Sequence, residues 1–150
     1  LVATPVLAQN AGQIAAVRRG ASCPGCNLFQ ADLSGLEKSG QNLSRARLRQ
    51  ADLSLVVMNR ANFAGADLRD VNAYGAVFSS ARFNGANLTN ASFVGTYLQG
   101  ARFDGANLSG ANFSGAEMDR AAGLTQRQLD GACGDEATRL PRGLRIPACR

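Results

Sequence analysis

The residues of this chain whose types and spacing could support chemistry are its four cysteines. Two form a Cys23-Pro-Gly-Cys26 motif, and the other two, Cys133 and Cys149, lie near the C-terminal end. Four cysteines allow three pairings, and a CxxC pair can be a disulfide, a redox site or part of a metal site. The motif lacks the βαβ context of a thioredoxin-like site, and Asn27 stands where a haem-attachment motif has histidine. We favour a structural disulfide, with a CxxC redox protein as an alternative.

Other catalytic candidates are scarce. The chain contains no histidine for acid–base work at neutral pH. It also shows no nucleophile elbow, phosphate-binding loop or metal-ligand spacing. Asp135, Glu136, Thr138 and Arg139 form a dense polar cluster near the C-terminal end, and we expect them to cap a helix and the end of the core. The sequence therefore predicts a protein that is not an enzyme and that binds no cofactor or metal.

A five-residue repeat runs from Cys26 to Met118 and would position these residues. Every fifth residue from Leu28 onward is apolar except Lys38, and the residue two positions earlier is usually alanine. A period of five fits neither a helix nor a strand, so each unit must turn the chain by a fixed angle. Stacked units would bury all the large side chains together, as in a solenoid. Around Lys38 and Gln41 the pattern weakens, which predicts a bulge in the first coil, with an outward-turned Lys38 as the alternative.

The repeat resembles that of the pentapeptide repeat family, whose pattern is Ala-(Asp/Asn)-Leu-x-x. The units that carry this resemblance are Ala31-Asp32-Leu33, Ala51-Asp52-Leu53, Ala66-Asp67-Leu68, Ala86-Asn87-Leu88 and Ala106-Asn107-Leu108. The resemblance implies an all-β fold, a right-handed quadrilateral β-helix with four units per coil. Residues 26–118 would then make just under five coils. Steps of twenty give one column of leucines and a second column, Leu43, Phe63, Phe83 and Phe103, that predicts an aromatic stack.

The ends of such a solenoid need caps, because they would otherwise expose core and unpaired backbone. We assign residues 9–25 to an N-terminal cap and residues 119–150 to a C-terminal cap. Thr125 and Gln128 have the spacing of a capping box, which predicts a short helix. The implied solenoid is roughly 23 Å long, whereas the Cα atoms of a disulfide lie within about 7 Å. The expected pairs are therefore Cys23–Cys26 and Cys133–Cys149.

The first eight residues resemble the end of a secretory signal. Val6-Leu7-Ala8 fits a small-x-small cleavage site before Gln9, so residues 1–8 read as a signal-peptide remnant. The alternative is a native apolar lead-in that covers the N-terminal end of the solenoid. A signal remnant together with disulfides predicts a periplasmic or secreted bacterial protein.

The net charge of +5 is unevenly distributed. Residues 26–118 carry eight basic and seven acidic side chains, and most of the excess lies in the flanks. The resemblance includes cytoplasmic quinolone-resistance proteins, which imitate DNA and bind gyrase, and such mimicry needs an acidic surface. The repeat region is not acidic, so we keep DNA mimicry with topoisomerase (gyrase) binding as the alternative function and not as the first choice. A cluster of basic residues lies near Asp67 and Asp70 and consists of Arg45, Arg47, Arg49 and Arg69. We expect a solvated face whose charges are partly paired, and at most a weak contact with a polyanion through these arginines.

One outward-facing group of residues breaks the polar pattern of the exterior. Its members are Leu55, Val57, Tyr74, Val77, Val94 and Tyr97. Such residues could simply stabilise stacked strands, since valine and tyrosine favour β-structure. Contiguous apolar surface is also used for contacts between proteins. The sequence thus predicts a non-enzymatic structural or protein-interaction module, with a protein partner or a second copy contacting these six residues and with no nucleic acid bound.

Overall fold

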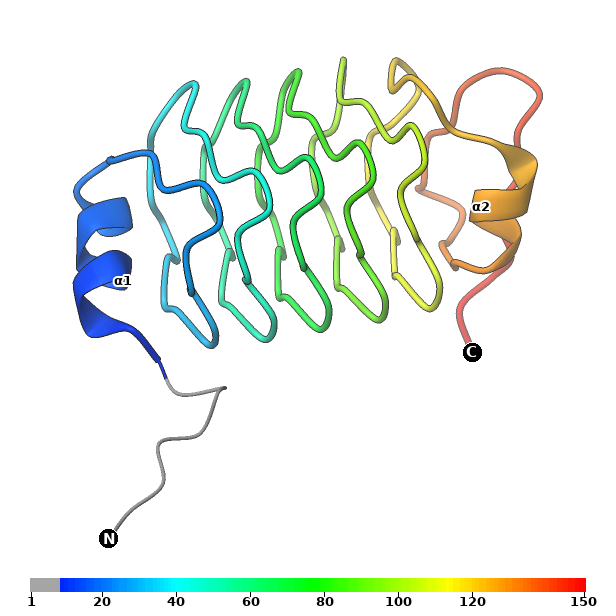
Figure 1. Ribbon diagram of the computed structural model, residues 1–150. Coiled ribbons are helices and arrows are strands. Elements are labelled where there is room, and N and C mark those ends of the chain that lie inside the picture. The colour runs from blue at the N-terminus through cyan, green and yellow to red at the C-terminus, as the bar shows by residue number, and fades with distance from the viewer. Residues whose placement is uncertain (1–8) are drawn as a thin grey trace, which may run out of the picture.

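The computed structural model describes residues 9–150, which form an elongated solenoid with a helix at each end (Figure 1). Helix α1 spans Ala11–Arg18 and helix α2 spans Gln126–Asp130. The predicted signal remnant, residues 1–8, lies outside the described residues. Within residues 9–150, neither helix is long and apolar enough to cross a membrane.

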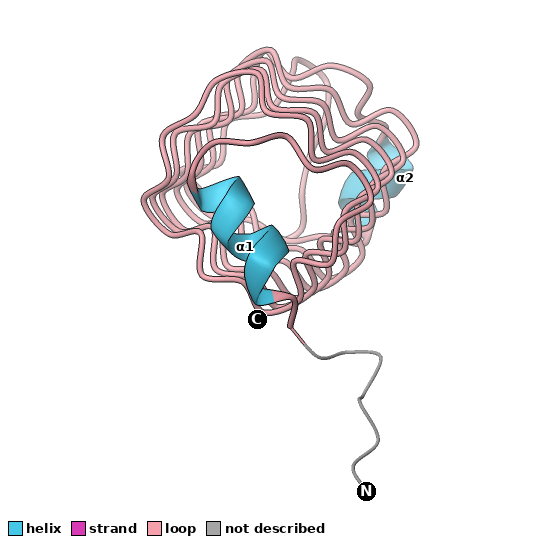
Figure 2. Cartoon of the chain, turned by 60° about the vertical axis from the view of Figure 1, so that its left-hand side comes forward, coloured by secondary structure: helices cyan, strands magenta, loops and turns pink. Residues whose placement is uncertain are grey.

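Parallel β-bridges join residues twenty positions apart along the solenoid. The four series begin with Asn27↔Arg47, Asp32↔Asp52, Glu37↔Val57 and Asn42↔Asn62. Successive coils lie nearly over one another when seen close to the axis (Figure 2). The predicted coil of four five-residue units is therefore confirmed. The β-structure of the coils consists of isolated bridges and not of extended strands, because a turn follows every three residues.

A tight turn closes each five-residue unit. In one of the first units, the N–H of Ala31 donates to the C=O of Leu28 over 3.0 Å. Between them, Gln30 has a φ of +56°. A positive φ at the third turn residue marks a type II turn and favours glycine or a small polar residue there. The fifth position of the repeat is therefore a turn corner, where glycine takes the positive φ most easily and Arg45, Leu55 and Arg60 also adopt it.

Large apolar side chains from all four faces fill the axis of the solenoid. Phe63 and Phe83 stack with ring centroids 5.3 Å apart and planes 5° apart. Phe83 stacks on Phe103 at 5.2 Å and 9°. Phe78 meets Phe63 edge-on at 5.6 Å from the adjacent face. The predicted aromatic column is confirmed, and such ring pairs add about 0.5–1.5 kcal/mol beyond the buried area.

The predicted bulge at Lys38 and Gln41 is wrong, because the bridges on either side of them, Glu37↔Val57 and Asn42↔Asn62, keep the regular spacing of twenty residues. The N–H of Lys38 donates to the C=O of Val57 over 3.0 Å, as in the other units. The Lys38 side chain turns outward, and its stem lies near Gly20, where an added Cβ would be 3.1 Å from Lys38 Cδ. Gln41 is buried, and its Nε2 donates to the carbonyls of Val17 at 3.1 Å and Ala21 at 2.7 Å. The departure from the repeat thus attaches the N-terminal helix to the first coil.

Each end of the solenoid core is covered by one fully buried residue of a helix. Val17 of α1 and Leu129 of α2 are both 0% exposed. Asn10 caps α1 by accepting a hydrogen bond from the N–H of Gln13. The predicted capping box is present at α2, where Thr125 and Gln128 exchange hydrogen bonds. Each cap side chain thus satisfies one of the N–H groups in the first turn of its helix.

Pairing with the solenoid continues beyond Met118, where the sequence repeat ends. Arg102 still bridges Ala122 at the regular spacing of twenty. Asn112 then bridges Cys133, and Glu117 bridges Arg139, so one and then two residues are added to the coil. The C-terminal segment is thus an irregular further coil in which α2 takes the place of one face. The added residues explain why the five-residue pattern disappears from the sequence.

Candidate interaction surface

All four cysteines are paired, so within the described residues there is no free thiol. Cys23 and Cys26 form one disulfide with Cα atoms 5.5 Å apart, and Cys133 and Cys149 form the other at 4.8 Å. Cys26 is 8% exposed and occupies a position of the small-residue column. The N–H of Cys23 also donates to the C=O of Asn42 over 2.9 Å, so the first disulfide lies within the hydrogen-bonded coil.

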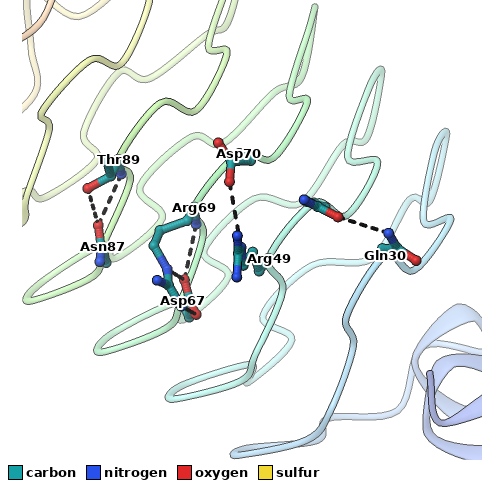
Figure 3. Close-up of polar contacts among 8 residues, drawn as sticks. Gln30, Arg49, Asp67, Arg69, Asp70, Asn87 and Thr89 are labelled. Atoms are coloured by element: carbon teal, nitrogen blue, oxygen red, sulfur yellow. Dashed lines mark hydrogen bonds and ion pairs between the residues drawn. The ribbon is translucent and has the colours of Figure 1, made fainter. Parts of the chain in front are cut away.

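The arginine cluster is partly neutralised by aspartates. Arg69 binds Asp67 through two hydrogen bonds, Nε to Oδ1 at 2.8 Å and Nη2 to Oδ2 at 2.6 Å. Arg49 Nε lies 3.6 Å from Asp70 Oδ2, and Figure 3 shows this pair joining two neighbouring coils beside the Asp67–Arg69 pair. The hydrogen bonds from Arg69 hold the pKa of Asp67 below its ordinary value, and Asp67 in turn raises the pKa of Arg69.

Arg45 is left outside these pairs, and so is Arg47. Within residues 9–150 neither side chain takes part in an ion pair. Both are exposed, and Arg45 lies over Gly65, where an added Cβ would be 3.3 Å from its Cγ. The structure therefore brings the four predicted arginines together but leaves only two of them unpaired.

The six predicted apolar residues lie on adjoining coils and form one surface, which we call the apolar wall: Leu55, Val57, Tyr74, Val77, Val94 and Tyr97. Val77 bridges both Val57 and Tyr97. Around the corner, the N–H of Leu55 donates to the C=O of Tyr74 over 2.9 Å. Tyr74 is 55% exposed and Tyr97 is 39% exposed, whereas the three valines are half-buried. The valines thus form the base of the wall, and the larger side chains project from it.

Leu55 is the most unusual member of the apolar wall. Its φ is +59°, in the left-handed region where a branched apolar side chain is disfavoured. It is also 61% exposed, so burial of the leucine does not repay this strain. Equivalent corners one coil below and above are Gly35 and Gly75, which take the same conformation without that cost. The glycines at these corners were the sequence signal that could have revealed the strain at Leu55.

Glutamates stand at both ends of the apolar wall, a feature that the sequence interpretation missed. Glu37 bridges Val57 at one end, and Glu117 bridges Tyr97 at the other. Glu117 also lines a surface hollow of about 500 Å³ together with Glu136 and Arg139. Steps of twenty from Val57 would have found both flanking glutamates.

The C-terminal polar cluster fixes the last irregular coil. Asp135 Oδ1 accepts hydrogen bonds from the N–H of Gly115 at 2.9 Å and of Ala137 at 3.0 Å. The bond from Gly115 is the main cause that lowers the pKa of Asp135. Thr138 Oγ1 donates to the C=O of Phe113 over 2.9 Å. These side chains are engaged with backbone groups, which is a capping arrangement.

Three solved structures show the same fold. The chain superposes on the pentapeptide repeat protein alr5209 of Nostoc PCC 7120 with a TM-score of 0.58 and 19% identity, over 91% of this chain and 99% of that one. A second match is a trypsin-treated variant of QnrB1, a plasmid-mediated fluoroquinolone resistance protein. Its TM-score is 0.52 and its sequence identity 22%, over 83% of this chain and 78% of that one.

HetL, from Nostoc sp. strain PCC 7120, is a pentapeptide repeat protein involved in the regulation of heterocyst differentiation. It gives a TM-score of 0.51 and 20% identity, with 87% of this chain covered. The chain spans only 63% of the length of HetL. No curated protein sequence matches the chain.

The family model described as pentapeptide repeats matches residues 42–79, 57–95 and 86–121, which together exceed half of the chain. The match falls on the coils whose bridges repeat every twenty residues. Repeat sequence and coil geometry agree, and the chain is a member of the pentapeptide repeat family.

Proposed function

We propose that this protein is a non-enzymatic structural and protein-interaction module that contacts a protein partner, or a second copy of itself, through the apolar wall. The observation that carries this proposal is Leu55, which is 61% exposed and held at a φ of +59°. Other described corners hold polar residues such as Arg45 and Arg60 at a similar φ, but Leu55 is the apolar side chain held there, at a cost on the order of 1–3 kcal/mol. Because Leu55 is 61% exposed, the solenoid buries less than half of its side chain.

The neighbours of Leu55 support the same use. Tyr74 and Tyr97 are the other large apolar side chains that remain exposed in the described part of the chain. Tyrosine is enriched at protein interfaces, because it offers a large apolar ring and a polar tip. All three exposed side chains therefore gather around one corner of the solenoid, on two adjoining faces.

We propose an extracytoplasmic location, periplasmic or secreted. Two disulfides at opposite ends of a chain with no free thiol among its described residues support an oxidising compartment.

In this proposal residues 9–25 and 119–150 cap a β-helix of residues 26–118, and the coil is right-handed. The likeness to QnrB1, at 22% identity, concerns the fold alone and does not favour topoisomerase binding.

A pull-down from periplasmic extract tests the proposed function. The wild type is compared with a Tyr74→Ser plus Tyr97→Ser variant, and circular dichroism verifies that both are folded. The matched control is Arg45→Ser plus Arg47→Ser, which removes two exposed long side chains that lie outside the apolar wall. We expect a partner that the wild type and the arginine control recover and the tyrosine variant does not. Equal recovery of every protein by all three would refute the role of the apolar wall.

A further inference from the structure

We infer that the apolar wall accepts a cationic amphipathic helix of a protein partner, with basic side chains near Glu37 at one end and near Glu117 and Glu136 at the other. This inference rests on the proposed function and names the chemistry of the partner. It follows from three features of the wall, namely the placement of its glutamates, its length and the pairing of its backbone.

The glutamates of the chain have an uneven distribution. The sequence contains three, Glu37, Glu117 and Glu136, and each lies at an end of the apolar wall or in the hollow beside it. All three are exposed, and none takes part in a side-chain hydrogen bond or an ion pair within residues 9–150. The aspartates on other faces include several that are bound to arginine, serine or backbone groups. The free acidic side chains of this basic protein thus frame its apolar surface.

Basic groups of the chain also lie near these glutamates. Lys38 follows Glu37, but its stem lies near Gly20 of the N-terminal segment. Arg139 lines the hollow with Glu117 and Glu136, so two carboxylates face one guanidinium there. Each end of the wall therefore keeps an acidic group without an ion-pair partner. A partner with lysine or arginine at its ends would supply the missing charge.

The length of the wall fits a short helix. Glu37 and Glu117 belong to one bridge series and are four coils apart. At a coil spacing of about 4.8 Å, this separation is about 19 Å along the axis. An α-helix with a rise of 1.5 Å covers that distance in about 13 residues. The partner should therefore carry basic residues about 13 positions apart with an apolar stripe between them.

The backbone of the wall favours contact through side chains. The N–H of Val77 donates to the C=O of Val56, and the N–H of Tyr97 donates to that of Ala76. These bonds use the backbone groups that an added strand would need. A helix needs no such groups and can place its apolar stripe against Leu55, Tyr74 and Tyr97.

The hollow at the C-terminal end gives one basic side chain a defined location. It has a volume of about 500 Å³, and Gly95 and Gly115 line it on the side of the apolar wall. Leu55 occupies the equivalent corner nearer the N-terminal end, two coils before Gly95, and its side chain lies over Gly75. The wall is thus bounded by Leu55 on one side and by the acidic hollow on the other.

Fluorescence anisotropy with synthetic peptides tests this inference on the full chain. The probe is a labelled 15-residue amphipathic peptide of leucine and lysine, and its counterpart has glutamate in place of every lysine. The first variant is Glu37→Gln plus Glu117→Gln plus Glu136→Gln. Its control, Asp70→Asn plus Asp104→Asn plus Asp130→Asn, removes the same charge from exposed positions elsewhere.

We expect the lysine peptide to bind the wild type and the aspartate control alike. The glutamate variant should bind roughly fivefold or more weakly, with a smaller dependence on salt. The glutamate peptide should not bind. Equal binding of both peptides, or an unchanged affinity in the glutamate variant, would overturn the inference.

A third variant separates this inference from the proposed function. Tyr74→Ser plus Tyr97→Ser should weaken binding of the lysine peptide as well. If the tyrosine changes abolish partner recovery while the glutamate changes affect neither peptide nor partner, the wall is an interaction surface but its partner is not cationic. If neither set of changes has an effect on peptide or partner, both proposals fail.

Discussion

The side chain of Leu55 lies over Gly75 on the next coil, so closely that an added Cβ at residue 75 would be 2.8 Å from Leu55 Cδ2. The pair is complementary, because a side chain at residue 75 would displace the leucine. Gly75 also has a φ of +67°, which a residue with a side chain rarely adopts. The exposed position of Leu55 thus depends on the glycine above it.

Replacement of Leu55 should separate stability from binding. We expect Leu55→Gly to raise the free energy of unfolding by up to about 1 kcal/mol, because glycine adopts the positive φ without strain. Leu55→Asn should raise it by a smaller amount, since asparagine tolerates this conformation better than leucine does. Both variants should lose binding at the apolar wall. Urea denaturation measures the effect, and a loss of more than 1 kcal/mol in Leu55→Gly would show that the leucine serves the fold.

Gln41 should be essential for the attachment of α1. Its replacement by alanine removes the two hydrogen bonds to the carbonyls of Val17 and Ala21. The C=O of Val17 keeps its bond from the N–H of Gly20 at 2.8 Å, so the C=O of Ala21 is the acceptor that loses its partner, and we expect a loss of about 1 kcal/mol. Hydrogen exchange should become faster in α1 before it does in the later coils. The control is Gln9→Ala, which removes one exposed bond to the C=O of Gln30, and equal effects of the two changes would contradict this role.

Acid should weaken the contribution of the Asp67–Arg69 pair. The pKa of Asp67 is below its ordinary value of 3.8, chiefly because of the hydrogen bond from Arg69. A carboxyl group with a lowered pKa stabilises the fold above its ordinary pKa, and this contribution is lost as pH falls through the folded value. In Arg69→Gln the pKa of Asp67 should rise toward 3.8, as NMR titration would show. Arg102→Gln should leave the Asp67 pKa unchanged, and the same shift in both variants would argue against a local cause.

The two disulfides should differ in their contribution to stability. Cys133 and Cys149 are 16 positions apart, whereas Cys23 and Cys26 are 3 apart. By the loop-entropy relation, replacement of Cys133 and Cys149 by serine should cost about 3 kcal/mol, and replacement of Cys23 and Cys26 about 2 kcal/mol. Thiol titration of the native protein should find no reactive cysteine. Rapid, selective reduction of Cys23–Cys26 with exchange onto a dithiol substrate would instead favour redox activity.

The core of the fold could be predicted from the sequence because every unit repeats the same local choice. The apolar column of the repeat and the capping box at Thr125 follow from spacing, and the stack of Phe63 on Phe83 follows once the family resemblance implies four units per coil. Gln41 could not be interpreted in this way, since its partners come from the non-repetitive segment before the coils. The same holds for Cys133, which rejoins the solenoid only after one residue has been added.

The candidate surface was only partly predictable for a related reason. Its six apolar residues depart from the polar pattern and are visible in the sequence. The strain at Leu55 depends on backbone conformation, which becomes evident when all corner residues are aligned. The relation of Glu136 to Glu117 depends on the irregular last coil, whose register the repeat does not determine.

The most direct test of the apolar wall as the interaction surface is site-specific photo-crosslinking in intact cells. A photo-reactive amino acid is placed at Tyr97, and in a matched experiment at Arg82, an exposed bridge residue on another face. The account predicts a discrete crosslinked product from residue 97, to a partner or to a second copy, and none from residue 82. Identical products from both positions, or none from residue 97 in cells that contain the folded protein, would contradict it.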